Sequence, residues 1–238
     1  IDKYPKLKYY KDADMIFPCS TAVMGHMLKI GFPAERAVVV YNPVDIPRYS
    51  RDMKVRAEIR AKYGVGDATK IILGAGRFVD WKGFEYLIEA YADFIKGGSA
   101  VDTCLWLVGD GPEMARYKSL VEKLGLNEKT SFHGFASDIR PWLWASDIFV
   151  QPSQEPEGFS LMLLEAMAAE SKNIVTPVYY NKLLTNRYAQ DDDSKYMIDL
   201  IIRSEVIDLD QIFRWGNVLT AIQKELHRGS ESIGSYYE

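Results

Sequence analysis

The sequence predicts an α/β fold with a doubly wound parallel sheet, followed by helices at the C-terminal end. From residue 70 onward, short apolar runs rich in β-branched residues alternate with longer segments of helical periodicity. This alternation is typical of strand, helix, strand units, whose strands lie parallel. The composition, 47% hydrophobic and 26% charged residues over 238 positions, is that of an ordinary globular chain. A chain of this length can form one sizeable α/β domain together with a smaller part.

The chain before residue 70 contains a shorter set of predicted elements. Residues 13–18 and 37–41 are apolar runs, and each is expected to form a short buried strand. A helix is predicted between them, over residues 20–30, because capping residues stand at both of its ends. A further helix is predicted over residues 56–63.

Strands and helices then alternate along the rest of the chain. The predicted strands cover residues 70–75, 104–108, 130–133, 148–151 and 173–176. The predicted helices cover residues 84–96, 113–124, 138–145 and 160–169, and, beyond the sheet, 182–188, 195–204 and 209–228. In a sheet of this kind ligands bind beyond the carboxyl ends of the strands. Candidate site residues are therefore expected in the loops that follow the strands.

Charge and hydropathy exclude several classes of function. The net charge is −4, and without a basic surface no nucleic-acid partner is expected. No apolar run approaches the roughly 18 residues needed to span a bilayer. Residues 1–12 are basic and aromatic, which leaves peripheral membrane contact open, although a solvated helix face is favoured. Cys19 and Cys104 each lie in an apolar run, which indicates buried free thiols and a reducing, cytoplasmic compartment.

Two acidic residues flank the start of the predicted helix over residues 160–169. Glu157 and Glu165 are eight residues apart, which corresponds to about 12 Å if both are helical. A carboxylate accepts two hydrogen bonds from neighbouring sugar hydroxyls, and the free N–H groups of a helix start favour an anion. The pair is therefore compatible with a site for the two ends of a nucleotide diphosphate sugar. On spacing alone, however, a helix-capping glutamate followed by a solvated one is favoured, because acidic residues are common at helix starts.

The loop after the first strand of the sheet carries two cations. Arg77 and Lys82 lie five residues apart and can converge on a diphosphate. The loop is not a dinucleotide-binding fingerprint, because Gly74 and Gly76 are followed by Val79 where a third glycine is required. Two solvated cations are the alternative interpretation of this loop.

These motifs occur together in an order that resembles a known family. Pro152-Ser153, Glu157-Gly158-Phe159 and Leu164-Glu165-Ala166-Met167-Ala168 resemble the signature of two glutamates separated by seven residues in retaining GT-B glycosyltransferases. This is the large glycogen-synthase-like and sucrose-synthase-like group, also called glycosyl transferases group 1. The cationic loop is similar to the family's Gly-Arg, four residues, Lys-Gly loop, whose Arg and Lys bind the donor diphosphate. The resemblance covers residues 13–177.

The resemblance implies three parts of the chain. Residues 1–48 would be a remnant of the N-terminal acceptor domain with the interdomain linker, whose Asn-x-Val-Asp turn stands here as Asn42-Pro43-Val44-Asp45. Residues 49–180 would be the nucleotide-sugar-binding, Rossmann-like domain, and residues 181–238 a C-terminal helical segment. Most of the N-terminal domain is then expected to be missing. Because a GT-B site forms between two domains, the fragment alone is expected to be inactive.

The resemblance also implies the function of a retaining hexosyltransferase. The donor would be a nucleotide diphosphate sugar, and the acceptor a glycan, lipid or protein held by the missing domain. Neither a cofactor nor a metal would be required. Arg77 and Lys82 would stabilise the departing diphosphate and Glu157 would hold the sugar hydroxyls, so these three count as catalytic. Glu165 would bind the ribose. The other donor-binding residues would be Gly76, Phe135 against the base, Gly158, Phe159 and Ser160.

The chain departs from the family after Ala168. The family continues into a strand and then a paired-glycine loop followed by a glutamate, whereas residues 169–177 contain no such loop. Two other classes therefore stay open: a nucleotide-sugar-binding module without transferase activity, and a structural domain whose site has decayed. The run Asp191-Asp192-Asp193 and the three histidines lack metal-ligand spacing, so a solvated loop is favoured over a metal site.

Overall fold

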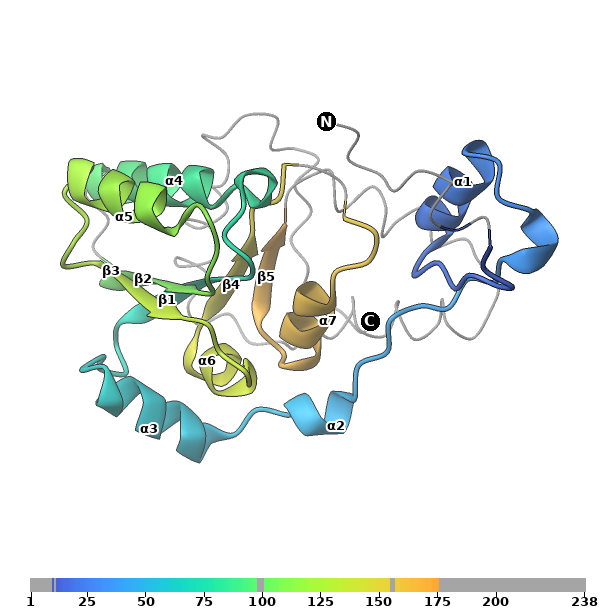
Figure 1. Cartoon of the computed structure of the whole chain (residues 1–238). Coiled ribbons are helices and arrows are strands. Elements are labelled where there is room, and N and C mark those ends of the chain that lie inside the picture. The colour runs from blue at the N-terminus through green and yellow to red at the C-terminus, as the bar shows by residue number, and fades with distance from the viewer. Residues whose placement is uncertain (1–9, 11, 98–100, 155–156, 176–238) are drawn as a thin grey trace, which may run out of the picture.

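Five parallel strands form the centre of the molecule. The structure is a computed structural model that describes residues 10, 12–97, 101–154 and 157–175. Its strands are β1 (Lys70–Ala75), β2 (Thr103–Val108), β3 (Thr130–Gly134), β4 (Ile148–Gln151) and β5 (Lys172–Val175). They lie side by side in the order β3-β2-β1-β4-β5, and every neighbouring pair is parallel (Figure 1). The predicted parallel sheet is confirmed.

Apolar runs located the strands well because a covered parallel sheet buries both of its faces. β1 and β4 begin and end at the predicted residues, β2 and β5 begin one residue earlier than predicted, and β3 ends one residue later. Successive side chains of β1 point to opposite faces of the sheet. Ile71 and Leu73 belong to one hydrophobic core, and Ile72 belongs to the other. The sheet therefore separates two cores.

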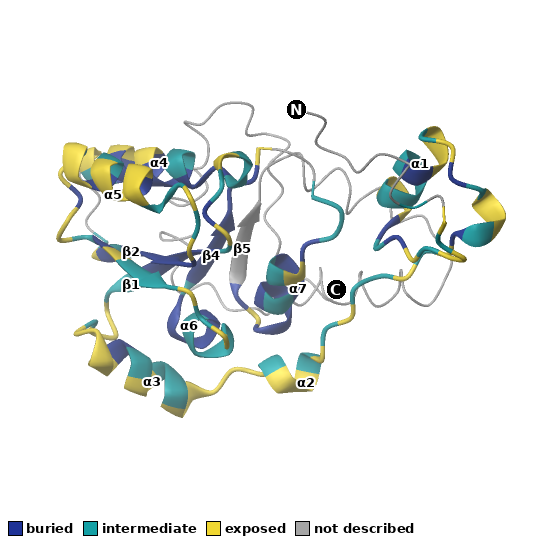
Figure 2. Ribbon diagram, viewed as in Figure 1, coloured by how far each residue is buried: buried dark blue, intermediate teal, exposed yellow. Residues whose placement is uncertain are grey.

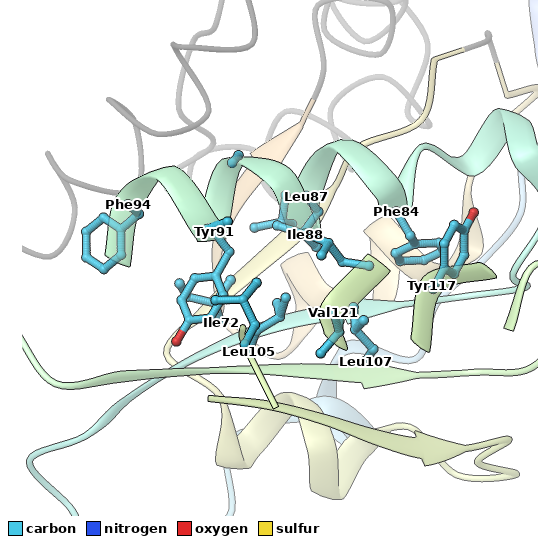
Figure 3. Close-up of a cluster of buried hydrophobic side chains, with 14 of the residues drawn as sticks. Ile72, Phe84, Leu87, Ile88, Tyr91, Phe94, Leu105, Leu107, Tyr117 and Val121 are labelled. Atoms are coloured by element: carbon cyan, nitrogen blue, oxygen red, sulfur yellow. The ribbon is translucent and has the colours of Figure 1, made fainter. Parts of the chain in front are cut away.

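Helices α4 (Phe84–Lys96) and α5 (Met114–Lys123) cover one face of the sheet. The apolar side chains of α4 recur every three or four residues and point toward the strands (Figure 3). They are Phe84, Leu87, Ile88, Tyr91 and Phe94, and they pack with Ile72, Leu105 and Leu107 of the strands and with Tyr117 and Val121 of α5. Each such burial stabilises the fold by about 1.5 to 3 kcal/mol relative to an exposed side chain.

Helices α3 (Met53–Lys62), α6 (Arg140–Ala145) and α7 (Leu161–Ala168) contribute to the core on the other face. Trp106 of β2, Leu143 of α6 and Leu164 of α7 are fully or almost fully buried there. Figure 2 shows that β4 is buried, whereas the outer surfaces of α3, α4 and α5 are exposed. Because helices cover both faces, the predicted doubly wound arrangement is confirmed.

Two arginines of α3 fasten that helix to the turn before β4. The Arg60 side chain is 1% exposed, and both Arg60 and Arg56 form ion pairs with Asp147. Arg60 also donates to the backbone carbonyls of Gly66, Thr69 and Ala145. A buried guanidinium without partners is strongly destabilising, so these acceptors determine where α3 docks. Nothing in the sequence indicated this contact.

The segment before α3 contains α1 (Thr21–Lys29), the short 3-10 helix η2 (Ala34–Arg36) and α2 (Ile46–Tyr49). Helix α1 confirms the helix predicted over residues 20–30. The two predicted buried strands are wrong. In these two segments the structure describes an isolated β-bridge between Ile16 and Ala37 instead of strands. Phe17, Val38 and Val40 are exposed. An apolar run becomes a buried strand only when neighbouring strands supply hydrogen bonds and a core.

Some predictions fall outside the described residues. These are the helices over residues 182–188, 195–204 and 209–228, the run Asp191-Asp192-Asp193, and the last residue of the strand expected at 173–176. The expected boundaries at residues 48 and 180 stay predictions. None of the helices in the described part of the chain combines the length and the apolar character that crossing a membrane requires.

Candidate functional site

The carboxyl ends of β1, β2 and β3 open into a cavity of about 680 Å³. Four predicted site residues line it: Gly76, Arg77, Phe135 and Glu165. They come from the loops after β1 and β3 and from α7. The structure therefore brings them together at the edge where parallel α/β sheets bind ligands.

A close approach of two strand ends shapes this cavity. Gly109, directly after β2, has a φ of 146° and donates its N–H to the Gly134 carbonyl at 2.7 Å. A Cβ at Gly109 would lie 1.9 Å from the carbonyl oxygen of Gly76. Any side chain there would force the loops after β1 and β2 apart, so the cavity in this form requires glycine at this position.

The two predicted cations have different surroundings. Arg77 is exposed and lines the cavity. Lys82 ends the short 3-10 helix η3 (Asp80–Lys82) and forms an ion pair with Glu157, with 2.7 Å between Nζ and Oε1. The side chains of Lys82 and Glu157 are only 14% and 10% exposed. The structure therefore joins one predicted cation to one predicted carboxylate, outside the set of residues that line the cavity.

Glu157 also accepts hydrogen bonds from two neutral donors. Gln151 Nε2 and Ser153 Oγ donate to its Oε1 at 2.7 and 2.5 Å. The Gln151 amide is oriented by a second bond, because its Oε1 accepts from Ser160 Oγ at 3.2 Å. A carboxylate with a cation and two hydrogen-bond donors is a well-stabilised anion even when it is largely buried.

Backbone contacts join the loops that carry Lys82 and Glu157. Gly83 has a φ of 69°, and a Cβ there would lie 2.2 Å from the carbonyl oxygen of Pro152. The N–H of Gln154 donates to the Trp81 carbonyl at 2.9 Å. Only glycine allows the two backbones to come this close, so the ion pair depends on Gly83.

Glu165 lies on α7, after the N-cap Ser160, whose Oγ accepts from the N–H of Leu163. Oε1 of Glu165 accepts a hydrogen bond of 2.7 Å from the hydroxyl of Tyr49, a residue that also lines the cavity. Burial and this bond raise the pKa of Tyr49 far above its ordinary value. Because α7 begins at Leu161, Glu157 is not helical, and the expected separation of about 12 Å along a helix does not apply.

The remaining predicted residues differ in what they contact. Phe135 is 79% exposed and projects from the loop after β3. Phe159 contacts the N-terminal segment: its carbonyl accepts from Asn42 Nδ2 at 2.8 Å, and its ring lies 5.3 Å from that of Tyr41. Gly158 approaches the same segment, since a Cβ there would lie 3.1 Å from Cys19 Sγ. Donor roles for these residues stay predictions.

An aromatic cluster lies beneath the loop after β3. The rings of Tyr63, Trp106 and Trp142 surround the His133 imidazole, with centroids 4.5 to 4.9 Å from it. Burial lowers the pKa of His133 to about 4. His133 is therefore neutral at physiological pH, and it is a half-buried member of this aromatic cluster.

Charges of both signs line the cavity. Arg48, Arg77 and Arg140 are its cations, and Arg140 forms a fork on Asp138 with bonds of 2.9 and 2.6 Å. This fork lowers the pKa of the Asp138 carboxyl. Among the residues that the structure describes, no three His, Cys, Asp or Glu side chains gather as metal ligands would. Metal independence stays a prediction.

Two residues that hold the predicted carboxylates, Gln151 and Tyr49, were not predicted from the sequence. Gln151 ends an otherwise apolar strand at the edge where ligands bind, and a polar residue in that position was a usable signal. Tyr49 gave no comparable signal, because its contact with Glu165 joins positions 116 residues apart.

The parallel sheet with helices on both faces is the Rossmann-like α/β arrangement found in GT-B glycosyltransferases. WaaG, a glycosyltransferase involved in lipopolysaccharide biosynthesis, superimposes with a TM-score of 0.67 at 21% identity, over 90% of this chain and 53% of WaaG. Anabaena HepE in complex with UDP-glucose gives a TM-score of 0.67 at 20% identity, over 93% of this chain and 66% of HepE. At these identities the likeness shows the fold alone.

The chain belongs to the family Glycosyl transferases group 1, whose model matches residues 55–190. The lipopolysaccharide core biosynthesis glycosyltransferase LpsE of Rhizobium meliloti is 31% identical over 69% of this chain and 45% of LpsE. N-acetyl-alpha-D-glucosaminyl L-malate synthase of Bacillus anthracis is 30% identical over 66% of this chain and 40% of that enzyme. The chain thus spans less than half the length of these curated relatives.

Proposed function

We propose that this chain binds a nucleotide diphosphate sugar and forms the donor-binding part of a retaining glycosyltransferase that transfers a hexosyl group. The observation that carries the proposal is the cavity at the carboxyl ends of the strands. Arg77 and Glu165 line this cavity, and the Lys82–Glu157 pair lies on the neighbouring loops. Such a site combines cations for a diphosphate with carboxylates for hydroxyl groups.

In this proposal the nucleotide occupies the cavity. Arg77 is exposed toward it and has the planar guanidinium that binds phosphate oxygens in pairs. Phe135 supplies an exposed aromatic surface for the base, and the stacking of a base on such a ring is favourable. Glu165 accepts hydrogen bonds from the ribose hydroxyls. These three residues define the nucleoside diphosphate end of the donor.

The Lys82–Glu157 pair would meet the donor where the sugar joins the diphosphate. Lys82 would share its charge between Glu157 and the diphosphate, while Glu157 would accept hydrogen bonds from the sugar hydroxyls. Together with Arg77, Lys82 would stabilise the charge that develops on the departing diphosphate. Two positioned cations perform the task that a divalent ion performs elsewhere, so no metal should be required.

Two further observations support the proposal. HepE, which shares the fold, was solved with UDP, with UDP and glucose, and with UDP-glucose. Cys19 and Cys104 are free thiols, which fits a reducing compartment such as the cytoplasm.

Calorimetry tests donor binding. We expect at least one of UDP, GDP and ADP to bind residues 1–238, and to bind equally well in the presence of EDTA. The corresponding nucleotide sugar should bind as well. Binding of none of these ligands would overturn the proposal. A magnesium or manganese requirement would overturn the assignment of Arg77 and Lys82.

A binding module without transferase activity is the second candidate. It is favoured by the sequence after β5, because no paired glycines follow that strand. Both candidates bind the donor, so binding does not distinguish them. Turnover of the bound nucleotide sugar by the full-length protein identifies the transferase, and its absence with the donor bound identifies the module.

A further inference from the structure

We propose that Tyr49 is a positioning residue: its hydroxyl holds one oxygen of the Glu165 carboxylate and so presents the other oxygen to the ribose hydroxyls of the nucleotide. The inference rests on the proposed function, because it assumes that the cavity receives a nucleotide. It assigns to the segment ahead of the sheet an indirect part in ligand recognition, through Glu165.

Tyr49 is itself held from both ends. Its backbone carbonyl accepts a hydrogen bond of 2.8 Å from the indole Nε1 of Trp144, on α6. Its ring packs against the hydrophobic core formed with α6 and α7. Its hydroxyl then reaches Glu165 Oε1 at 2.7 Å. A side chain fixed at backbone and ring can orient its partner, because it cannot follow that partner into solvent.

The chemistry of this bond differs from that of an ion pair. A glutamate side chain has three rotatable bonds, and fixing it from solution costs rotamer entropy. A neutral phenol fixes the carboxylate and leaves its negative charge available. The raised pKa keeps Tyr49 protonated at neutral pH, so the hydroxyl donates and the carboxylate accepts.

One of the three cations that line the cavity, Arg140, binds another carboxylate. Arg140 donates to both oxygens of Asp138 through its fork. For Glu165, the described contacts contain one side-chain hydrogen bond, that from Tyr49. Removal of the Tyr49 hydroxyl should therefore release Glu165 to other rotamers without altering the ring packing.

The test compares ribose with a sugar that lacks both hydroxyls. UDP, GDP and ADP are each titrated by calorimetry against the 2′,3′-dideoxy counterpart, with the wild-type chain and with Tyr49→Phe. We expect Tyr49→Phe to weaken binding of the ribonucleotide three- to fivefold and to leave binding of the dideoxynucleotide unchanged. The ratio of the dideoxynucleotide dissociation constant to the ribonucleotide dissociation constant then falls by the same factor. A purely structural role would weaken both ligands equally and leave the ratio unchanged, which would overturn the inference.

Two other variants show whether Tyr49 acts through Glu165. Glu165→Gln should lower the ratio at least as far as Tyr49→Phe, and the double variant should match Glu165→Gln alone. Additive losses in the double variant would overturn the inference, because Tyr49 would then contact the ligand independently. Tyr91→Phe is the matched control. The Tyr91 hydroxyl donates to the carbonyl of Thr103 at the amino end of β2, away from the cavity, so its loss should leave the ratio unchanged.

The outcomes also separate this inference from the proposed function. If no nucleotide binds the wild-type chain, both fail. If Glu165→Gln lowers the ratio but Tyr49→Phe does not, the nucleotide site stands and only the role of Tyr49 is refuted. Thermal unfolding of each variant checks that the fold is retained. Retention is expected because phenylalanine keeps the ring of tyrosine and glutamine keeps the size of glutamate.

Discussion

Glu157 and Glu165 lie eight residues apart, but their surroundings differ in charge. Glu157 faces the ammonium of Lys82 and two neutral donors. Glu165 accepts a hydrogen bond from one neutral hydroxyl, that of Tyr49, and lies in no ion pair that the structure describes. The first carboxylate is therefore neutralised by a direct ion pair, and the second lies at the wall of the cavity without one.

The difference indicates where an anionic ligand is tolerated. A diphosphate next to an uncompensated carboxylate is repelled, whereas next to the Lys82–Glu157 pair it meets a cation whose charge it can share. We therefore expect the diphosphate to lie on the side of Lys82 and the ribose, which is uncharged, to lie on the side of Glu165.

The largest effect is expected from Lys82→Ala. This change removes a charge-assisted hydrogen bond, worth about 1.5 to 3 kcal/mol, and leaves Glu157 uncompensated beside the diphosphate. Affinity for the nucleoside diphosphate and for the nucleotide sugar should fall by roughly one to two powers of ten, measured by calorimetry at fixed salt. Lys123→Ala, an exposed lysine of α5, is the control. Unchanged affinity in Lys82→Ala would show that Lys82 serves Glu157 alone.

Glu157→Ala should affect one ligand only. Without its hydrogen bonds to the sugar hydroxyls, the nucleotide sugar should bind about tenfold more weakly. The nucleoside diphosphate has no such hydroxyls and should bind equally well, or slightly more tightly once Lys82 is released. Glu128→Ala, an exposed glutamate before β3, is the control. Equal losses for both ligands would contradict the assignment of Glu157 to the sugar.

Glu165→Ala should weaken both ligands to a similar degree, by about tenfold or somewhat less, because both contain the ribose. Circular dichroism should show an unchanged fold. A loss confined to the nucleotide sugar would reverse the assignment of the two carboxylates.

The smallest effect is expected from acid, which lowers the stability of the fold and so limits the pH range in which the two carboxylates can be compared. His133 has a pKa of about 4 in the fold, below its unfolded value of about 6.5. Above pH 6.5 the ring is neutral in both states. As the pH falls from 6.5 to 4 the unfolded state gains a proton that the folded state does not, so stability falls, by roughly 1 kcal/mol at pH 5.5.

Thermal unfolding at several pH values measures this loss, and His133→Phe should abolish it. Asp102 and Asp138, whose lowered pKa values stabilise the fold, lose that contribution only below about pH 3.8. The two effects therefore occupy different pH ranges. An unchanged pH dependence in His133→Phe would exclude His133 as its source.

Much of the fold was predictable because its signals are local. The boundaries of β1, β4 and α4 follow from apolar runs and helical periodicity within single segments. The strands expected over residues 13–18 and 37–41 failed for the converse reason. Their apolar character is local, but a buried strand also needs neighbours, and no pattern within those runs reports whether neighbours exist.

The site was predictable in composition but not in pairing. Arg77, Lys82, Glu157 and Glu165 were found through loop position and motif order. The contact of Lys82 with Glu157 depends on the adjacency of β1 and β4 and on the close approach at Gly83, which only the fold determines. The same holds for Tyr49, whose partner is set by how α2 docks on α7.

The order of strands in the sheet also governs when this site is completed during synthesis. β1, β2 and β3 are consecutive in the chain and adjacent in the sheet, whereas β4 joins β1 on its other side. A ribosome adds about 5 to 20 residues per second, so several seconds separate Lys82 from Glu157. In that interval the first three strands and the two helices over them can already assemble. The nascent chain therefore carries its cation in water until β4 brings the carboxylate that neutralises it.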